Sequence, residues 1–168
     1  LTPSMRQCLF LAAVLGPNLG DLAVYSSLDL TLSQTMESLA ALTDRRILRD
    51  VGSGTEFMNE LVRAHVYGAI PAPLRVQLHS LIADHLIAST GNGRRDQHLE
   101  IAWHLIRSRR GQEVVEYLIG GAEDALLRGA PDDVILALES FPRDVLSNSD
   151  GSRDRIPELL VEALYETS

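Results

Sequence analysis

Apolar residues near the start of the chain recur at steps of three and four residues, which is the spacing of one helical face. Thr2 followed by Pro3 is typical of a helix start, and Gly16-Pro17 is typical of a stop. Apolar positions after Thr31, combined with Ser33 and Glu37, indicate a further helix that ends in the basic pair Arg45 and Arg46. Three helices are therefore predicted, over residues 3–15, 21–27 and 31–44.

The spacing of apolar residues changes after residue 46, from that of a helix to that of strands. The residues of 47–51 and 56–58 suit two strands, and the turn between them, Gly52-Ser53-Gly54-Thr55, is rich in glycine. This pattern predicts a β-hairpin. Asn59 can cap a helix that Pro71 and Pro73 end, and a second helix should cover about 73–88. Three helices followed by a two-stranded ribbon is the order of a winged-helix unit.

Residues 90–96, TGNGRRD, continue neither apolar pattern and are the best candidate for a linker. The second half is helical in period, and its antiparallel pairs resemble tetratricopeptide repeats of about 34 residues. We therefore predict a mainly α fold with two parts, a winged-helix-like domain over 1–89 and a helical-repeat segment over 90–168. The helices expected in the second part cover 96–109, 112–128, 131–140 and 154–167, with breaks at Gly111, Gly129-Ala130-Pro131 and 147–152.

Two stretches carry a family resemblance. Residues 56–86, EFMNELVRAHVYGAIPAPLRVQLHSLIADHL, resemble the end of the winged helix in bacterial STAND-type ATPase regulators of the large LuxR-type and cyclase-linked class. Residues 101–139, IAWHLIRSRRGQEVVEYLIGGAEDALLRGAPDDVILALE, are similar to the helical repeats that follow it there. The resemblance implies an AAA-like core that binds ATP or ADP elsewhere in the full-length protein. It makes this chain a non-catalytic middle segment of a transcriptional regulator.

Asn59 is the position that matters most in this resemblance. The family segment usually reads F-x-H-D-L-V-R, and its His contacts nucleotide phosphate in related switches, whereas this chain has Phe57-Met58-Asn59-Glu60-Leu61-Val62-Arg63. An Asn amide can donate a hydrogen bond but cannot carry the charge of a protonated imidazole. The resemblance places Asn59 and Arg63 against the nucleotide core, where they contact the domain or sense nucleotide. The simpler reading is that Asn59 caps a helix.

The composition of the chain limits the kinds of binding and catalytic site that it can form. The chain has 168 residues, a net charge of -8, no Lys and one cysteine, Cys8, for which a small buried side chain is the expectation. A phosphate-binding G-x-x-x-x-G-K-[ST] loop cannot be written without Lys, so this chain should bind no cofactor of its own and hydrolyse no ATP. The five histidines include no i, i+4 pair that would suggest a metal site, and His79 and His104 lie in apolar patterns typical of the core. We predict neither a metal site nor a catalytic site.

The sequence also indicates where the chain is located and what it contacts. No apolar run approaches the roughly 20 residues of a membrane span and no signal peptide is recognisable, so a cytoplasmic location without membrane contact is expected. The first residue is Leu, so the chain is expected to be cut from a longer protein. Its partners would be a neighbouring nucleotide-binding domain and, through the acidic helical half, a partner protein or a small-molecule inducer.

DNA binding is the alternative function, because winged helices commonly read the major groove with their third helix. Here that helix carries Glu37 and has no basic residue before Arg45. Duplex affinity rests largely on neutralising phosphates, so this composition argues against direct binding. The local basic cluster consists of Arg45, Arg46 and Arg49, which would serve a DNA-binding regulator with a helical dimerisation tail. A third reading is a bare helical-repeat scaffold, which would lack the hairpin at 47–58.

Overall fold

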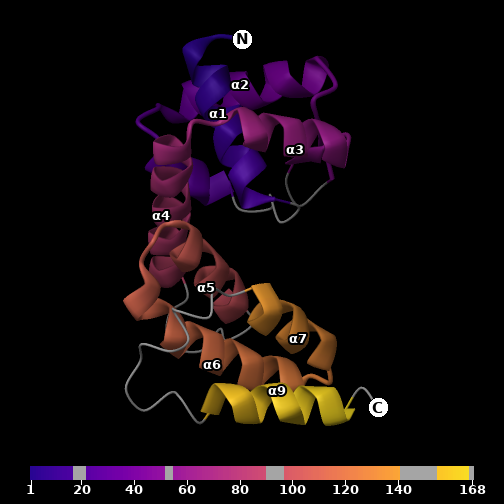
Figure 1. Cartoon of the computed structure of the whole chain (residues 1–168). Coiled ribbons are helices and arrows are strands. Elements are labelled where there is room, and N and C mark those ends of the chain that lie inside the picture. Colours follow the sequence, from indigo (N-terminus) through magenta and orange to yellow (C-terminus); the bar gives the residue numbers. More distant parts are fainter. Residues whose placement is uncertain (17–21, 52–54, 90–96, 141–154, 167–168) are drawn as a thin grey trace. The chain divides into compact units, whose positions relative to one another are not determined.

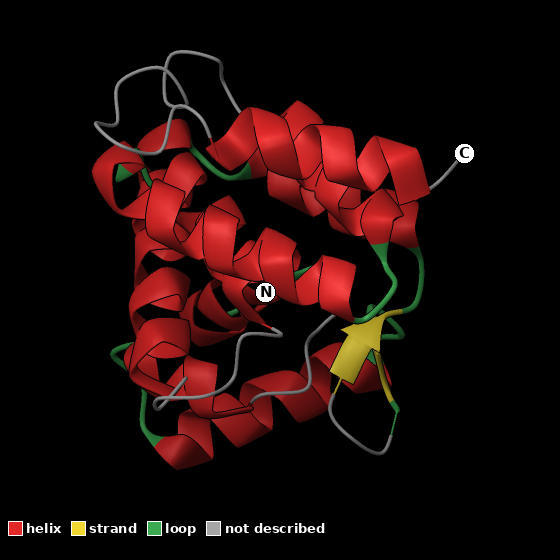
Figure 2. Ribbon diagram, turned by 90° about the horizontal axis from the view of Figure 1, so that it is seen from below, coloured by secondary structure: helices red, strands yellow, loops and turns green. Residues whose placement is uncertain are grey.

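The computed structural model describes residues 1–16, 22–51, 55–89, 97–140 and 155–166. This part of the chain is mainly helical, with one small antiparallel sheet of two strands (Figures 1 and 2). It divides into two compact units, Leu1–Ile82 and Ala83–Ser168, which we call unit 1 and unit 2. The division falls inside helix α4 (Ala72–Ser89), whereas the sequence placed it in the segment 90–96, which lies outside the described residues.

Helix α1 (Pro3–Leu15) supplies much of the core of unit 1 and has the predicted bounds. The Thr2 hydroxyl accepts a hydrogen bond from the Met5 N–H at 3.2 Å, and Gly16 ends the helix with a positive φ of 75°. Cys8 is fully buried, as expected. Most of the side chains of α1 are buried: Met5, Cys8, Leu9, Leu11, Ala12, Ala13, Val14 and Leu15.

The helix predicted over 21–27 is a short 3-10 helix, η1 (Leu22–Ser27). Its hydrogen bonds span three residues: the Leu28 N–H donates to the Tyr25 carbonyl, and the Ser26 hydroxyl donates to the Ala23 carbonyl. The ring of Tyr25 is fully buried, and this burial raises the pKa of its phenol. Short 3-10 helices of this kind are common as connectors between longer helices.

Helix α2 (Leu32–Asp44) matches the helix predicted over 31–44 to within one residue. Its capping box joins Thr31 and Gln34, while the Ser33 hydroxyl donates to Glu37 on the helix surface. The buried face carries Thr35, Ser38, Leu39 and Leu42. Leu32 and Met36, two of the apolar positions that indicated the helix, are exposed.

Helices α3 (Glu60–Ala69) and α4 follow the hairpin and are joined by a short turn around the buried Ile70. The Tyr67 hydroxyl lies 3.0 Å from Nε2 of His79, whose side chain is almost wholly buried. The guanidinium of Arg75 lies over the Tyr67 ring, 5.2 Å from its centroid. His79 is therefore a hydrogen-bonded core residue, as the sequence indicated.

The described residues of unit 2 form the end of α4 and four further helices: α5 (His98–Arg107), α6 (Gly111–Leu127), α7 (Pro131–Ser140) and α9 (Arg155–Glu166). Helix α5 packs against α6 as a helical hairpin, and α7 and α9 pack against each other and against α6 (Figure 1). His104 is buried in this unit, in agreement with its apolar surroundings in the sequence.

The turn between α5 and α6 corrects one prediction. Gly111 was expected to break the helices, but it is the first residue of α6. The break consists of Ser108–Arg110, where Arg109 has a φ of 63° and donates its N–H to the Ile106 carbonyl, while the Arg110 N–H donates to Leu105. Two hydrogen bonds of this kind close a helix C-terminus around a left-handed residue, which is usually glycine. An arginine in that place gave no signal in the sequence.

Helices α5 and α6 approach closely at Gly120 and Gly121. A Cβ added to Gly121 would lie 2.8 Å from the backbone nitrogen of Leu99, and one added to Gly120 would lie 2.8 Å from Nδ1 of His98. The absence of a side chain at Gly121 allows the α5 backbone to come this near, and its absence at Gly120 leaves room for the His98 ring.

Candidate functional site

The hairpin in unit 1 is formed by β1 (Leu48–Asp50) and β2 (Thr55–Phe57), with Arg49 opposite Glu56. Leu48 and Phe57 are paired and buried, so one face of the ribbon packs on the unit. On the other face the Arg49 guanidinium forms an ion pair with Glu56. The hairpin predicted over 47–58 is confirmed in its strands, which removes the basis of the bare-scaffold reading. Its turn at 52–54 lies outside the described residues.

Asn59 follows the hairpin and caps α3. Its backbone is extended, and its Oδ1 accepts a hydrogen bond from the Leu61 N–H at 2.7 Å. This is the ordinary role of Asn at a helix start. The side-chain oxygen is thus used inside the fold, and the amide nitrogen is the group that Asn59 has for a phosphate or a neighbouring domain.

Arg63 joins two helices of unit 1. Its Nη1 donates to the Ala13 carbonyl of α1 at 2.9 Å, and its Nε donates to both carboxylate oxygens of Glu60 at 2.8 Å. These hydrogen bonds hold the pKa of Glu60 below its ordinary value. The Arg63 side chain is only 22% exposed, so the structure gives Arg63 a positioning role for α3 in addition to any contact with another domain.

The three arginines of the possible DNA surface are not equivalent. Arg45 directs Nη1 to the Met5 sulfur at 3.3 Å, and Arg49 pairs with Glu56. Arg46 is exposed and has a φ of 56° at the end of α2. The exposed residues of α2 include Glu37 and Asp44 and no basic side chain. No positively charged face forms on this helix, which is the arrangement that weakens the case for duplex binding.

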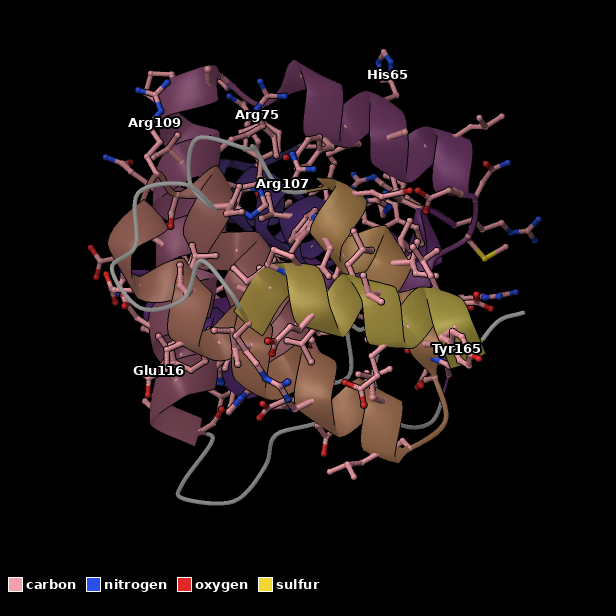
Figure 3. All side chains as sticks on the ribbon, turned by 60° about the horizontal axis from the view of Figure 1, so that its bottom comes forward. His65, Arg75, Arg107, Arg109, Glu116 and Tyr165 are labelled. Atoms are coloured by element: carbon pink, nitrogen blue, oxygen red, sulfur yellow. The ribbon has the colours of Figure 1, made fainter. Side chains whose placement is uncertain are left out.

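The outward face of α3 exposes large apolar side chains, and the sequence analysis missed it. Exposure reaches 78% for Leu61, and Met58 and Val62 beside it are 47% and 40% exposed. His65, one turn after Leu61, projects from the same side of the helix (Figure 3). We call Met58, Leu61, Val62 and His65 the α3 patch.

A signal for the α3 patch was present in the sequence. Apolar residues occupy nearly every side of ELVRAHVYGA, whereas a helix that covers only its own core has one apolar stripe. The inner stripe, which includes Val66 and Tyr67, is half-buried in unit 1, and no residue of α3 is fully buried. The remaining apolar residues face outward. The charged side chains of α3, Glu60 and Arg63, pair with each other.

Unit 2 also exposes large apolar side chains. On α9 these are Val161, Leu164 and Tyr165, and Tyr165 is seen at the surface of the helix in Figure 3. Leu127 and Leu136 are exposed on α6 and α7. The unit carries nine arginines and sixteen Asp and Glu residues, so it is strongly acidic, in contrast to unit 1 with six and seven.

The described residues include no group of three or more His, Cys, Asp or Glu side chains placed to hold a metal ion. No helix in the same part of the chain combines the length and apolar character needed to cross a membrane. Comparison with protein-family models, curated proteins and solved structures found no match to this chain.

Proposed function

We propose that this chain is a non-catalytic segment of a signal-responsive, ATP-dependent transcriptional regulator. Unit 1 is a winged-helix-like domain that docks on a neighbouring nucleotide-binding domain through the α3 patch. Unit 2 is a tetratricopeptide-like segment that binds a partner protein or an inducer. The full-length regulator binds ATP or ADP, and this chain transmits the state of that site to its helical half.

The observation that carries the proposal is the group of exposed apolar side chains on α3 beside Asn59. Exposed apolar surface that the unit does not use for its own core is typical of a contact with another protein domain. The neighbours of the patch fit such a contact, because Ala64 and Gly68 are also exposed and are small enough to admit a close approach. The α3 patch contains no arginine that could neutralise the phosphates of a nucleic acid.

The electrostatics of the two units support the same division of labour. The ion pair between Arg49 and Glu56 neutralises one of the three arginines near the hairpin. Unit 2, with its excess of carboxylates, would repel a phosphate backbone and would attract a basic partner. These features favour protein contacts over duplex contacts for both units.

The experiment uses two leucines that are matched in exposure and in helical position. Leu61 on α3 and Leu32 on α2 lie in the first turns of their helices and are 78% and 79% exposed. Asp is favourable in a first turn, so L61D and L32D should both fold. The chain and the remainder of its full-length protein are produced as two separate polypeptides. Their association is measured by titration calorimetry.

We expect L61D to abolish the association and L32D to preserve it, since a buried carboxylate without a partner is costly at an apolar contact. Equal binding by both variants would contradict the proposal. So would ATP hydrolysis at an enzyme-like rate by the isolated 168-residue chain.

The DNA-binding alternative is tested separately on the isolated chain. A duplex is titrated at low salt and the complex is followed by gel shift for the chain and for the double variant R45A/R46A. Binding that falls steeply with salt and is lost in the double variant would favour a DNA-binding winged-helix regulator. We expect no such binding.

A further inference from the structure

Unit 1 contains a pocket that the proposed function does not use. It has a volume of about 210 Å³ and lies between α1, the segment after η1, and α4. Its apolar wall consists of Phe10, Leu28, Leu74, Leu78 and Leu81. Leu78 is buried and the other four are half-buried, so the wall is fixed by the packing of the unit.

The rim of the pocket is polar. Gln7, Ser27, Asp29 and Gln77 line it and are exposed. Within the described residues no hydrogen bond or ion pair of these four side chains holds them in another arrangement. An apolar wall with a few polar groups at the mouth is the usual construction of a small-molecule site.

Charge gives the pocket a preference. Asp29 is the charged residue among those that line it. Arg75 is next to Leu74 in the sequence but lies over the ring of Tyr67 and does not line the pocket. The mouth therefore presents one carboxylate and uncharged hydrogen-bonding groups, which suits a ligand with a positive charge outside an apolar body.

Size limits the ligand to a fragment. An apolar cavity of about 150 Å³ is known to hold benzene, and sites for drug-sized ligands begin near 300 Å³. A pocket of about 210 Å³ lies between these sizes and fits one ring with a short chain.

We propose that this pocket binds a small organic cation made of one aromatic ring and a short chain that ends in an ammonium group. The ring packs against the wall formed by Phe10 and the leucines of α4, and the ammonium group lies at the mouth beside Asp29. The inference is independent of the function proposed above, because it uses neither the α3 patch nor unit 2.

The test is an NMR titration of the full 168-residue chain with phenethylamine and, separately, with 3-phenylpropanoate, which has a similar shape and the opposite charge. We expect phenethylamine to shift the signals of Phe10, Leu28 and Leu78 with a dissociation constant on the order of 1 mM, because a single-ring ligand has few atoms. The acid should bind several-fold more weakly.

Two variants and a control decide the assignment. D29N should weaken phenethylamine binding by a few-fold and remove the preference over the acid, while E37Q, which removes a carboxylate on α2 outside the pocket, should change neither. L81W should fill the pocket and abolish binding of both probes in a chain whose spectrum remains that of a folded protein. Equal binding of amine and acid, equal effects of D29N and E37Q, or full binding by L81W would each overturn the proposal.

Discussion

Replacement of Gly121 by alanine tests the close contact on which the α5–α6 hairpin depends. The new Cβ would lie 2.8 Å from the backbone nitrogen and Cγ of Leu99 and 2.9 Å from its Cδ2. A side chain alone could rotate away, but the backbone of α5 can yield only if the whole helix shifts. The contact is therefore relieved at the expense of packing between the two helices.

The sign of the effect follows from two opposing free energies. Alanine in place of glycine inside a helix normally stabilises a protein by about 0.5–1 kcal/mol. Overpacking of a well-packed contact costs about 1–3 kcal/mol. The cost of overpacking should exceed the gain in helix propensity. We therefore expect G121A to lower the free energy of unfolding of unit 2 by about 1 kcal/mol. For a unit of this size, that change corresponds to a decrease in Tm of roughly 4–8 °C.

Two glycines serve as matched controls. Gly68 in α3 has no atom within 4 Å of an added Cβ, so G68A should show the helical gain alone in unit 1. At Gly120 the obstacle is the ring of His98, which can turn, so the effect of G120A should lie between the other two. Each of the three variants adds one methyl group to the parent chain.

The assay uses the single tryptophan of the chain, Trp103, which lies in α5 and reports on unit 2 through its fluorescence. Far-UV circular dichroism follows the helices of both units. A G121A variant whose tryptophan transition occurs at a higher temperature than that of the parent chain would refute the reasoning, because it would mean that α5 and α6 are not in close contact.

Three further predictions concern helix ends and pH. N59A should destabilise unit 1 by about 1 kcal/mol and N59D should not, because Asp can also cap α3; equal circular dichroism melting curves for the two variants would contradict the cap. R109G should stabilise unit 2 by about 0.5–1 kcal/mol, because glycine adopts the positive φ without strain; a lower denaturant midpoint by Trp103 fluorescence would be the wrong sign. Burial raises the pKa of both Cys8 and Tyr25, so the fold favours their protonated forms. The stability that they contribute is complete below the ordinary thiol pKa of about 8.5 and is lost as the pH rises above it. The denaturant midpoint of unit 1 should fall between pH 8 and pH 10, and should fall less in C8A; a midpoint that is constant over this range would exclude the effect.

Much of the fold could be read from local sequence signals. Thr2, Pro3 and Gly16 set the ends of α1 because capping and backbone strain act within a few residues. The change in the spacing of apolar residues at residue 47 indicated the hairpin. This signal is also local, since strand alternation is a property of neighbouring positions.

What the sequence could not supply depends on tertiary contacts. Leu32 and Leu39 are seven residues apart and lie on nearly the same face of α2, yet only Leu39 is buried, because the first turn of this helix is left exposed while its later turns are covered. The turn at Arg109 was missed because its conformation is held by hydrogen bonds to α5 and not by a residue type that favours it. Asn59 and Arg63 were selected by resemblance, and the coordinates show that both have roles inside unit 1.

Hydrogen–deuterium exchange of the backbone of α3 tests the central claim most directly. The exchange of residues 62–69 is measured in the isolated chain and in the full-length protein, with ADP and with a non-hydrolysable ATP analogue. If the α3 patch lies against a nucleotide-binding domain, exchange is slower in the full-length protein and differs between the two nucleotides. Identical exchange in all three samples, together with protection of Arg45–Arg49 by a DNA duplex, would contradict the account.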